Sequence, residues 1–534
     1  MNKVVSKSSM HFLSQKKGRA WLLVTWVLVV SIASLVGTHL LLEWLANRQW
    51  SYAQQVIRDK GLVLDWRELL PPRLAEDVNY AAIDPLWGIN FSEASEEQNE
   101  RVLANRQLLR QAQKGLETAY LSTSSVALGR LPEWSQISTS LVKSKLLEKS
   151  PPVGGEAVAI HQALDQKIPI LRQIAIASFA YSEAEFMPSW LGQDLSKILH
   201  ENKIPLSSTL NLVCKGLLLQ GIAAVESGDY VLALADARAI ILLSKAMMRE
   251  PSSLGRLVAM VYLRQTNEIL WNLCRHRSLS DEQWTDFGRL LSSIDHEHDY
   301  LRQHNLEMAG NLELIGHLAE HRSKCAAFFD APLIESFVRP EMAPLLPDWF
   351  FTLNRARVAG FEMEHVFHPF QENGWAGVSA QREMLIKDLH LAEAEWKHMD
   401  LVFSRLLMTT IYSSLNQALQ YESVWRQGIV AGALERYYLK HQNYPDKLQQ
   451  LLPDFLNSVP LDPMDHQPVR YTLTDSGRYK LWCVGVDGRD DGGKVNPGNK
   501  SNPDGSLNRP TYLGDWVWQY EPVPLATESD SEGK

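Results

Sequence analysis

Apolar residues run without interruption near the start of the chain and recur at helical spacing over much of the remainder. Residues 20–42, AWLLVTWVLVVSIASLVGTHLLL, are 23 positions without Lys, Arg, Asp or Glu. At about 1.5 Å per residue a helix of this length spans roughly 34 Å, enough for a hydrocarbon core about 30 Å thick. The pattern therefore predicts a transmembrane anchor over residues 20–44.

The residues beside this run predict its orientation. No acidic residue occurs before Glu43, and the segment 1–19 is basic through Lys3, Lys7, Lys16, Lys17 and Arg19. Because positive charge is retained on the cytoplasmic side, we expect residues 1–19 in the cytoplasm and everything after Trp44 to be exported. Trp21, Trp44 and Trp50 lie near the two ends, where indole rings favour the membrane interface.

A cleaved signal peptide is the alternative interpretation of this run. Its apolar core would be about 7–15 residues long and would be followed by a cleavage site with small residues. The run here is longer and continues directly into LEWLANRQW. We therefore favour an uncleaved anchor.

Residues 45–155 are expected to pass from a helical stalk into an irregular segment. Gly61 and the pair Pro71-Pro72 interrupt regular structure, because proline lacks an amide donor and restricts the residue before it. Polar and apolar residues then mix at helical spacing over about residues 92–121. PPVGG at 151–155 separates this stretch from a long helical region.

Residues 156–420 carry the main helical pattern and are predicted to form the body of the protein. The clearest signal is 207–277, where apolar residues recur at three- and four-residue intervals on both sides of Gly228-Asp229. Ser280 precedes Gln283 at capping-box spacing and predicts the start of a further helix. AVESGDYVLALADARAI resembles one tetratricopeptide-type hairpin, but it does not recur at the repeat period of that family. An irregular helical bundle or solenoid is therefore expected.

The composition changes from Tyr444 onward, where Pro, Gly, Asn and Asp become frequent and short β-like runs appear. These runs are PVRYTLT at 468–474, RYKLWCVG at 478–485 and WVWQY at 516–520, the first two joined by a hairpin-like Asp475-Ser476-Gly477 turn. We predict a small α+β domain with a short antiparallel sheet over residues 421–521, followed by an acidic tail at 522–534. The predicted fold class is mostly α, with a transmembrane helix, a helical body and this small C-terminal domain.

Length, charge and cysteine spacing narrow the classes of function. A chain of 534 residues is long enough for two or more domains, and its net charge of −9 leaves no basic footprint for nucleic acid. The four cysteines lie far apart with no CxxC pair, which excludes zinc-finger and thioredoxin-like sites. Outside the cytoplasm they could form disulfides, although three lie in helical patterns and buried free thiols fit equally well. They are Cys214, Cys274, Cys325 and Cys483.

Residues 481–494, LWCVGVDGRDDGGK, place several carboxylates and glycines directly after a strand-like run. Calcium takes about 6–8 oxygen ligands from carboxylates, backbone carbonyls and water, and glycine lets a loop turn these oxygens inward. Asp487, Asp490 and Asp491 would supply charge, and Asp504 and Asp515 could return from the far side of the loop. The spacing does not match an EF-hand. The composition fits either a calcium-binding loop or a solvated turn.

The C-terminal region resembles the C-terminal domain of the major pseudopilin of type II secretion systems. The likeness covers about residues 421–521 and runs from the helix ending in ALERYYLKHQNYP through LQQLLPDFL and VPLDP to the paired strands, VGVDG and GDWVW. In that family the corresponding loop binds calcium. The resemblance implies that the Val484 carbonyl, Asp487 and Asp515 are ligands, with Asp490 and Asp491 as further members.

Departures from that family show that the chain is not a pilus subunit. Leu23 stands where a pseudopilin carries Glu at the fifth position after its processing site, and the long helical body separates the membrane helix from the tail. The layout, with GLVLDWRELLPP and EDVNYAAIDP after the anchor, resembles uncharacterised single-span bacterial envelope proteins. The expected location is the inner membrane with most of the chain in the periplasm. This second likeness implies no activity.

HLAEH at 317–321 is the strongest enzymatic candidate, because it fits the HxxEH pattern of inverted zincins. On a helix His317 and His321 face the same side and can chelate zinc, with Glu320 as a potential base. A third ligand would be needed, and Glu393 or Glu395 is a candidate. The alternative is a polar helix face with an exposed His/Glu pair.

Other titratable clusters are weaker candidates. His296 and His298 are expected on different faces of a helix, and a loop near aromatic packing is expected for Glu362, Glu364, His365 and His368. The sequence contains no GxSxG elbow, Walker-type loop or dinucleotide fingerprint.

These observations together predict a non-catalytic, membrane-anchored envelope protein. Its helical body would bind another protein, and its C-terminal domain would be stabilised by calcium. An association with a secretion or pilus-like assembly is inferred from the tail alone. A zinc-dependent hydrolase that uses HLAEH is the alternative function.

Overall fold

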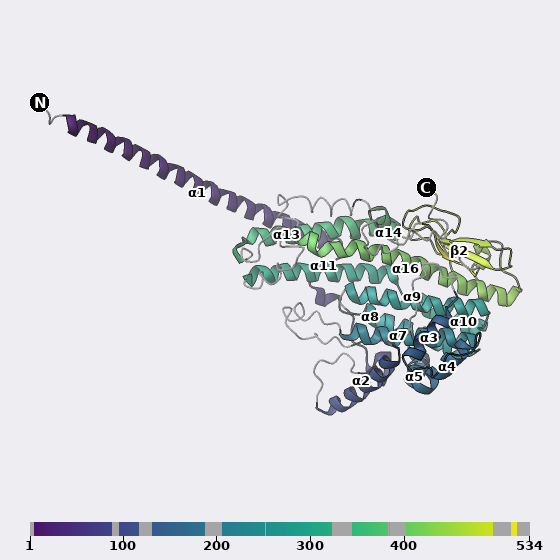
Figure 1. The fold of residues 1–534 in the computed structure, drawn as a ribbon. Helices are drawn as coiled ribbons and strands as arrows, with labels where there is room; N and C mark the ends of the chain where they lie inside the picture. Colours follow the sequence, from purple (N-terminus) through teal and green to yellow (C-terminus); the bar gives the residue numbers. More distant parts are fainter. Residues whose placement is uncertain are drawn as a thin grey trace, which may run out of the picture. The chain divides into compact units, whose positions relative to one another are not determined.

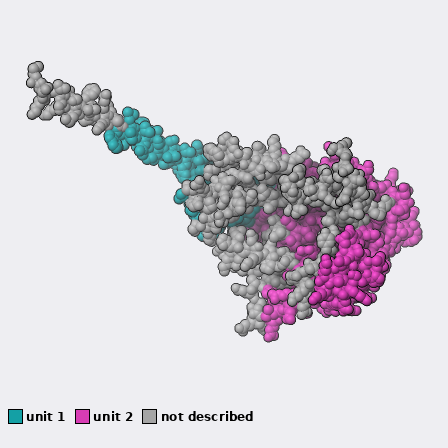
Figure 2. All heavy atoms as spheres, viewed as in Figure 1, with its two compact units in different colours: residues 1–64, 308–363, 389–408 teal, residues 65–307, 364–388, 409–534 magenta. Residues whose placement is uncertain are grey.

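The fold is taken from a computed structural model, which describes residues 5–87, 96–116, 131–186, 205–250, 253–322, 344–382, 384, 402–494 and 514–520. The chain divides into two compact units (Figure 2). The smaller unit comprises residues 1–64, 308–363 and 389–408, and the larger one comprises residues 65–307, 364–388 and 409–534. The predicted fold class is confirmed, because helices dominate the described chain and its strands form a short antiparallel sheet.

The smaller unit is built on α1 (Val5–Asp59), the long purple helix of Figure 1. Within Leu23–Asp59, the most apolar segment has a mean hydropathy of 1.9 and none of it is buried. The helix is therefore long and apolar enough to span a membrane. The helix continues beyond the apolar run. Ala46 and Ile57 are buried, where this half of α1 packs against α13 (Asp348–Glu362).

An arginine on α13 strengthens the contact with α1. The guanidinium carbon of Arg355 lies 4.3 Å from the ring centroid of Trp50, a cation–π distance. Trp50 is therefore half-buried and contacts a side chain of α13. Beyond its apolar stretch, α1 therefore packs into the smaller unit and does not form a free stalk.

The core of the larger unit is a stack of three helices, in which α8 (Tyr230–Met248) packs against both α7 (Pro205–Glu226) and α9 (Ser253–His276) (Figure 1). Gly228 has a φ of 81°, which favours glycine, and Asp229 Oδ1 accepts the N–H of Leu232 at 3.2 Å to cap α8. The predicted helices on both sides of the Gly228-Asp229 break are confirmed.

The first helix of this stack also has the length and hydropathy of a membrane span. Its stretch Thr209–Ser227 has a mean hydropathy of 1.2, but 72% of its apolar window is buried. Leu217 and Leu219 are fully covered by neighbouring side chains. This burial is typical of a core helix of a globular body rather than of a second anchor.

Further helices complete the described chain. Ser280 caps α10 (Asp281–Ser292) in a capping box with Gln283, as predicted, because each side chain binds the backbone N–H of the other residue. The remaining described α-helices are α2 (Glu96–Leu116), α3 (Trp134–Lys143), α4 (Glu156–Lys167), α5 (Pro169–Ala177), α11 (His296–Glu320), α14 (His368–Ala380) and α16 (Val402–His441), with short 3-10 turns at Trp66–Leu69, Glu76–Val78, Tyr80–Ala82, Ser178–Ala180 and Leu448–Leu451.

The segment around residues 362–368 corrects one prediction. The sequence pattern predicts a loop there, but the chain forms a π-helix at Met363–Phe367 that joins α13 directly to α14. The wider turn of a π-helix accommodates an extra residue without leaving helical geometry. Helical geometry is interrupted further along, inside α14, where Gly374 has a φ of 56°.

The irregular segment that begins the larger unit is held to its helices by side-chain hydrogen bonds. Asn79 Nδ2 donates to the carbonyl of Glu185 at 2.8 Å, and the N–H of Glu185 donates to Asn79 Oδ1 at 2.8 Å. Tyr80 is fully buried, and its hydroxyl donates to the carbonyl of Ile174 on α5 at 2.5 Å. The stretch EDVNYAAIDP therefore has a structural role in fixing this segment to the body.

The sheet lies at the C-terminal end of the described chain. Its antiparallel order is β1 (Arg470–Leu473), β2 (Tyr479–Cys483) and β3 (Trp516–Trp518), with Tyr471 opposite Leu481 and Leu481 opposite Trp518. The turn between β1 and β2 is closed by the N–H of Thr474, which donates to the carbonyl of Arg478 at 2.8 Å. The three predicted strands and the hairpin are confirmed.

The sheet shares its packing with the helical body. Trp271 on α9 donates from Nε1 to the carbonyl of Gln519 at 2.9 Å, and its ring stacks on Tyr520 with centroids 5.7 Å apart. Gln427 on α16 donates from Nε2 to the carbonyl of Trp516 at 2.8 Å. The region 421–521, which the composition marks as a separate domain, therefore belongs to the same compact unit as α7–α9.

Candidate metal centre in the acidic loop

The acidic loop, residues 484–494, leaves β2 and lies beside the start of β3. Gly485 and Gly514 pack backbone against backbone, so closely that a Cβ on Gly485 would overlap the carbonyl oxygen of Gly514. The loop then turns through Gly488, Gly492 and Gly493, which have φ values of 68°, 72° and 73°. Glycine adopts these values without strain, as the sequence analysis expects.

Asp515, at the start of β3, is a buried carboxylate beside this loop. It is 2% exposed, and its Oδ2 accepts the N–H groups of Asp491 at 3.1 Å and Gly493 at 2.7 Å. Its Oδ1 is also buried and has no hydrogen-bond partner among the described residues. Burial raises the pKa of Asp515, although the hydrogen bonds from those two amides act to lower it. The negative charges of Asp490 and Asp491 raise the pKa further.

Asp490 makes a different set of contacts. Its Oδ2 accepts from Arg470 Nε at 3.0 Å, while its Oδ1 accepts from the indole of Trp482 at 2.9 Å and from the N–H of Gly492 at 3.0 Å. Burial acts to raise the pKa of Asp490, but these three donors outweigh it and the pKa is lowered. Asp490 is therefore held as a carboxylate by groups of the protein itself.

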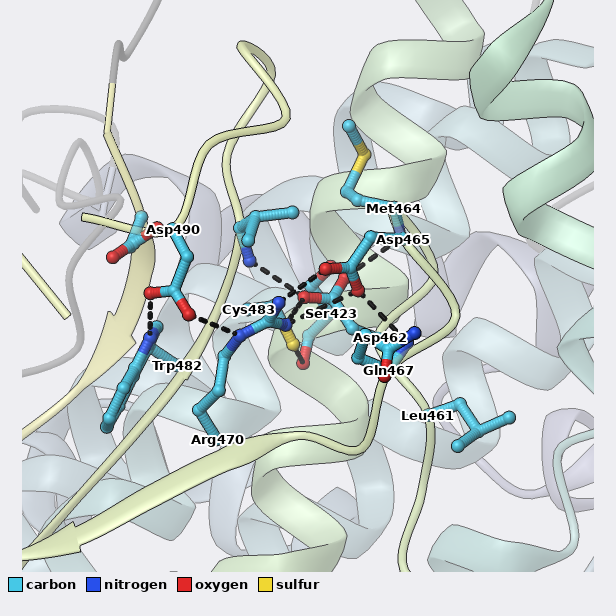
Figure 3. Close-up of polar contacts among 12 residues, drawn as sticks. Ser423, Leu461, Asp462, Met464, Asp465, Gln467, Arg470, Trp482, Cys483 and Asp490 are labelled. Carbon is cyan, nitrogen blue, oxygen red and sulfur yellow. Dashed lines mark hydrogen bonds and ion pairs between the residues drawn. The ribbon is translucent and has the colours of Figure 1, made fainter. Parts of the chain in front are cut away.

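Arg470 joins three aspartates, as Figure 3 shows. Its Nη1 donates to Asp462 Oδ2 at 2.6 Å, its Nη2 pairs with Asp465, and its Nε pairs with Asp490. Burial acts to lower the pKa of Arg470, but its carboxylate partners raise the pKa above the ordinary value. This arginine is the positive centre of the region.

Asp462 ties the arginine to the end of β2. Its side chain is fully buried and accepts the N–H of Met464 at 2.9 Å and the N–H of Val484 at 2.8 Å. Burial raises the pKa of Asp462 to about 6 despite these donors. Val484, implied as a carbonyl ligand by the pseudopilin resemblance, is thus fixed through its own amide.

The remaining residues of the expected calcium set lie on the exposed side of the loop. Asp487 is exposed and accepts the N–H of Arg489 at 3.2 Å, and the side chain of Asp491 is exposed as well. Lys480 donates from Nζ to the carbonyls of Gly492 at 3.2 Å and Gly493 at 3.3 Å. Asp504 lies outside the described residues.

The expected ligands are therefore brought together only in part. Asp490, Asp491 and Asp515 are close enough to affect one another electrostatically. Within the described ranges, no three or more His, Cys, Asp or Glu side chains are already arranged as a metal cage. Oδ1 of Asp515 has no hydrogen-bond partner among the described residues, whereas both oxygens of Asp490 accept from protein donors.

Sequence reasoning missed the cations of this site. Arg470 precedes Asp490 by twenty positions, and β pairing brings it near because Arg470 is directly opposite Trp482 in the sheet. Arg382, which follows α14, donates from Nη2 to the carbonyl of Val486 at 2.7 Å. An arginine near several aspartates was visible in VPLDPMDHQPVR, but nothing in the spacing indicated Arg382.

The HLAEH segment lies at the C-terminal end of α11. The rings of His317 and His321 stack with centroids 4.1 Å apart, and His321 Nδ1 lies 3.1 Å from the carbonyl oxygen of His317. Glu320 is exposed. The proposed third ligands, Glu393 and Glu395, lie outside the described residues.

His296 and His298, which are two residues apart, lie on different faces of their helix, as the spacing predicts. His296 is buried, with its Nδ1 3.8 Å from Glu422, whereas His298 is exposed and its N–H donates to Asp295 at 2.9 Å. The two therefore point to different surroundings.

The cysteines are free thiols wherever the structure describes them. Cys214, Cys274 and Cys483 are buried and unpaired with one another, while Cys325 lies outside the described residues. Burial raises the pKa of each of the three thiols, which makes them poor nucleophiles.

Comparisons with known proteins identified no relative of this chain. No protein-family model, curated protein or solved structure matches this chain.

Proposed function

We propose that this chain is a non-catalytic, single-pass envelope protein that a bacterial inner membrane holds by α1. The observation that carries the proposal is the continuity of α1, which passes from an unburied apolar window into a buried contact with α13. A helix that is exposed and apolar at one end and packed at the other fits a membrane on one side and a folded unit on the other. The basic segment 1–19 supports a cytoplasmic N-terminus.

The helical body is the proposed surface for a protein partner. The helices α7–α9 pack side by side in sequence order, and stacked helices of this kind commonly present extended surfaces that bind other proteins. Val231 and Val261 remain 54% and 39% exposed on α8 and α9, so apolar side chains face outward on two helices of this stack. A link to a secretion or pilus-like assembly is supported by the pseudopilin resemblance of residues 421–521.

Calcium is the proposed ligand of the acidic loop. The ion would be held by Asp515, by Asp487 and Asp491, and by the Val484 carbonyl, with Asp490 as a further ligand. It would supply the charge that offsets repulsion among these carboxylates. Because it would bind only the folded loop, it would stabilise the fold by an amount set by its concentration relative to Kd.

A topology experiment and a metal experiment test this proposal. A periplasm-active reporter fused after residue 60 is expected to be active, and a cytoplasm-active reporter at the same place is expected to be inactive. The full-length protein in detergent is expected to melt at a higher temperature in millimolar calcium than in chelator. The opposite reporter result would overturn the orientation, and identical melting with and without calcium would overturn the metal site.

Affinity isolation of the intact protein from native membranes tests the third element of the proposal. A protein partner is expected to co-purify in a fixed ratio, and the exchange of Val231 and Val261 for Asp is expected to reduce its recovery. Asp at Val158, which is 42% exposed on α4, is the matched control. Equal recovery with all three variants would contradict a binding surface on α8 and α9.

A further inference from the structure

The helix α1 passes from its apolar run into the smaller unit without a spacer (Figure 1). The run ends at Leu42, α1 continues unbroken to Asp59, and Ala46 is already only 1% exposed. At about 1.5 Å per residue, Ala46 lies roughly 6 Å along the helix from Leu42. The headgroup layer is about 5–7 Å thick on each side of the hydrocarbon core. In a membrane that holds residues 20–42, the side chains that cover Ala46 therefore lie at the level of the headgroups.

One face of α1 is left uncovered at the same level. Trp44 is 55% exposed, and Arg48, one turn further along, is exposed as well. The guanidinium carbon of Arg48 lies 5.4 Å from the ring centroid of Trp44. Because positions i and i+4 are neighbours on a helix surface, the indole and the guanidinium present one continuous face. The contact with α13 is made through other positions of α1, where Ala46 and Ile57 are buried.

The charge of Arg48 is available to an outside partner. Glu43 is the only acidic residue of α1 before Asp59, and its Oε2 lies 3.6 Å from Nε2 of His39. Among the described residues, no carboxylate forms an ion pair with Arg48. A guanidinium can donate two parallel hydrogen bonds to the oxygens of a phosphate, and an indole favours the membrane interface. This pair of side chains therefore has the chemistry that a phospholipid headgroup requires.

We propose that Trp44 and Arg48 form a phospholipid-binding site that seats the smaller unit directly on the exported face of the membrane. The guanidinium of Arg48 binds the lipid phosphate, and the indole of Trp44 lies beside it at the boundary with the acyl chains. This inference rests on the membrane anchor proposed above. It adds a lipid ligand and a position for the folded unit, whose contact between α1 and α13 begins beside the headgroups.

The position is tested with the full-length protein in lipid nanodiscs and with fluorotryptophan incorporated. The fluorine resonances of Trp26, Trp44 and Trp50 are assigned by their loss in the corresponding Phe variants. A spin label at the end of the lipid acyl chain is expected to broaden the resonance of Trp26 most. A spin label on the headgroup is expected to broaden the resonance of Trp44 more than that of Trp50, so the two rings bracket the level of Ala46.

These resonances separate the seating of the unit from the anchor itself. If the acyl-chain label broadens Trp26 but the headgroup label leaves Trp44 sharp, the inference is overturned and the anchor stands. If neither label broadens any of the three resonances, the inference and the anchor both fail. Stronger broadening of Trp50 than of Trp44 by the headgroup label would place Ala46 inside the hydrocarbon and would also overturn the inference.

Lipid binding is tested by following the Trp44 resonance while dihexanoylphosphatidylglycerol is added to the protein in detergent. Arg48→Gln is expected to bind this lipid about tenfold more weakly, because a charge-assisted hydrogen bond is lost. Arg48→Lys keeps the charge without the planar fork and is expected to fall between the two. Arg58→Gln removes another exposed arginine further along α1 and is the matched control.

Weaker binding in Arg48→Gln than in Arg58→Gln supports the headgroup site. Equal binding by the wild type and Arg48→Gln overturns it, and so does an equal loss in Arg48→Gln and Arg58→Gln, which would indicate only a general effect of charge. Inorganic phosphate is titrated in parallel. If it shifts the Trp44 resonance as strongly as the lipid does, the site binds the free ion and the assignment to a lipid is overturned.

Discussion

Arg382 Nη2 lies 2.7 Å from the carbonyl oxygen of Val486 and donates a hydrogen bond to it, which fastens the acidic loop to the end of α14. The same side chain donates from Nε to the carbonyl of Ser379 at 3.0 Å. A guanidinium held at its base in this way is pre-organised for the loop carbonyl. The loop is therefore anchored from the helical body as well as from its own strands.

Arg382→Met is expected to loosen the loop without unfolding the body. The hydrogen bond from a charged donor contributes about 1.5–3 kcal/mol, and part of that free energy is expected to be lost. The measurement is hydrogen exchange of residues 484–494, which should accelerate while exchange in α8 stays unchanged. Unaltered exchange in the loop would contradict the anchoring role.

Gly485→Ala is expected to destabilise the C-terminal sheet strongly. A methyl group at this position would collide with the Gly514 carbonyl, and that backbone cannot rotate away as a side chain could. Overpacking of this kind costs about 1–3 kcal/mol, which thermal unfolding will report as a lower Tm. Gly288→Ala, where nothing lies within 4 Å of the added atom, is the control and should leave the Tm almost unchanged or raise it.

Asp515→Asn is expected to abolish any effect of calcium on the Tm. The change removes the negative charge of a buried carboxylate beside the acidic loop and keeps its size. In chelator the variant should be at least as stable as the wild type, because a buried charge is no longer required. Asp454→Asn, at an exposed ion pair with Lys440, is the matched control. A full calcium response in Asp515→Asn would exclude this residue as a ligand.

The buried carboxyl group of Glu435 is expected to make the stability of the folded protein depend on pH. It accepts hydrogen bonds from the hydroxyls of Tyr444 at 2.9 Å and Tyr479 at 3.1 Å, and burial raises its pKa from 4.5 to about 7. Because the folded pKa is the higher one, the contribution of Glu435 to stability is complete below about pH 4.5 and is lost as the pH rises through about 7.

Glu435→Gln is therefore expected to weaken the fall in stability between pH 5 and pH 8. Denaturant unfolding at the two pH values should show a difference between wild type and variant of up to about 3 kcal/mol. Other buried carboxyl groups titrate in both proteins, so the comparison isolates Glu435. Parallel pH profiles for the two proteins would contradict the assignment.

Asp229→Ala is expected to cost about 1 kcal/mol of stability through the loss of the cap of α8. The side chain accepts the N–H of Leu232 at 3.2 Å, and its Oδ2 lies 3.3 Å from Arg172 Nη2, so an ion pair is lost as well. Asp286→Ala, which breaks an exposed pair with Arg289, is the comparison and should change the Tm little. Equal losses in both variants would argue against a specific capping role.

The sequence by itself determined the elements that depend on local physics. The apolar run from residue 20, the Gly228-Asp229 break, the Ser280–Gln283 capping box and the turn at Gly477 were all readable, because each rests on neighbouring residues in the chain. The carboxylates of the acidic loop were identified for the same reason. Membrane anchorage, the protein partner and calcium remain predictions.

Only the tertiary structure decided where long-range partners meet. It placed Trp50 against Arg355, brought β3 and the residues after it to α16 and α9, and brought Arg470 and Arg382 to the acidic loop. These contacts join residues that are far apart in sequence, and their energies depend on burial that no local pattern reports. The charge of the loop was therefore visible in the sequence, whereas the cations that balance it were found only in the folded chain.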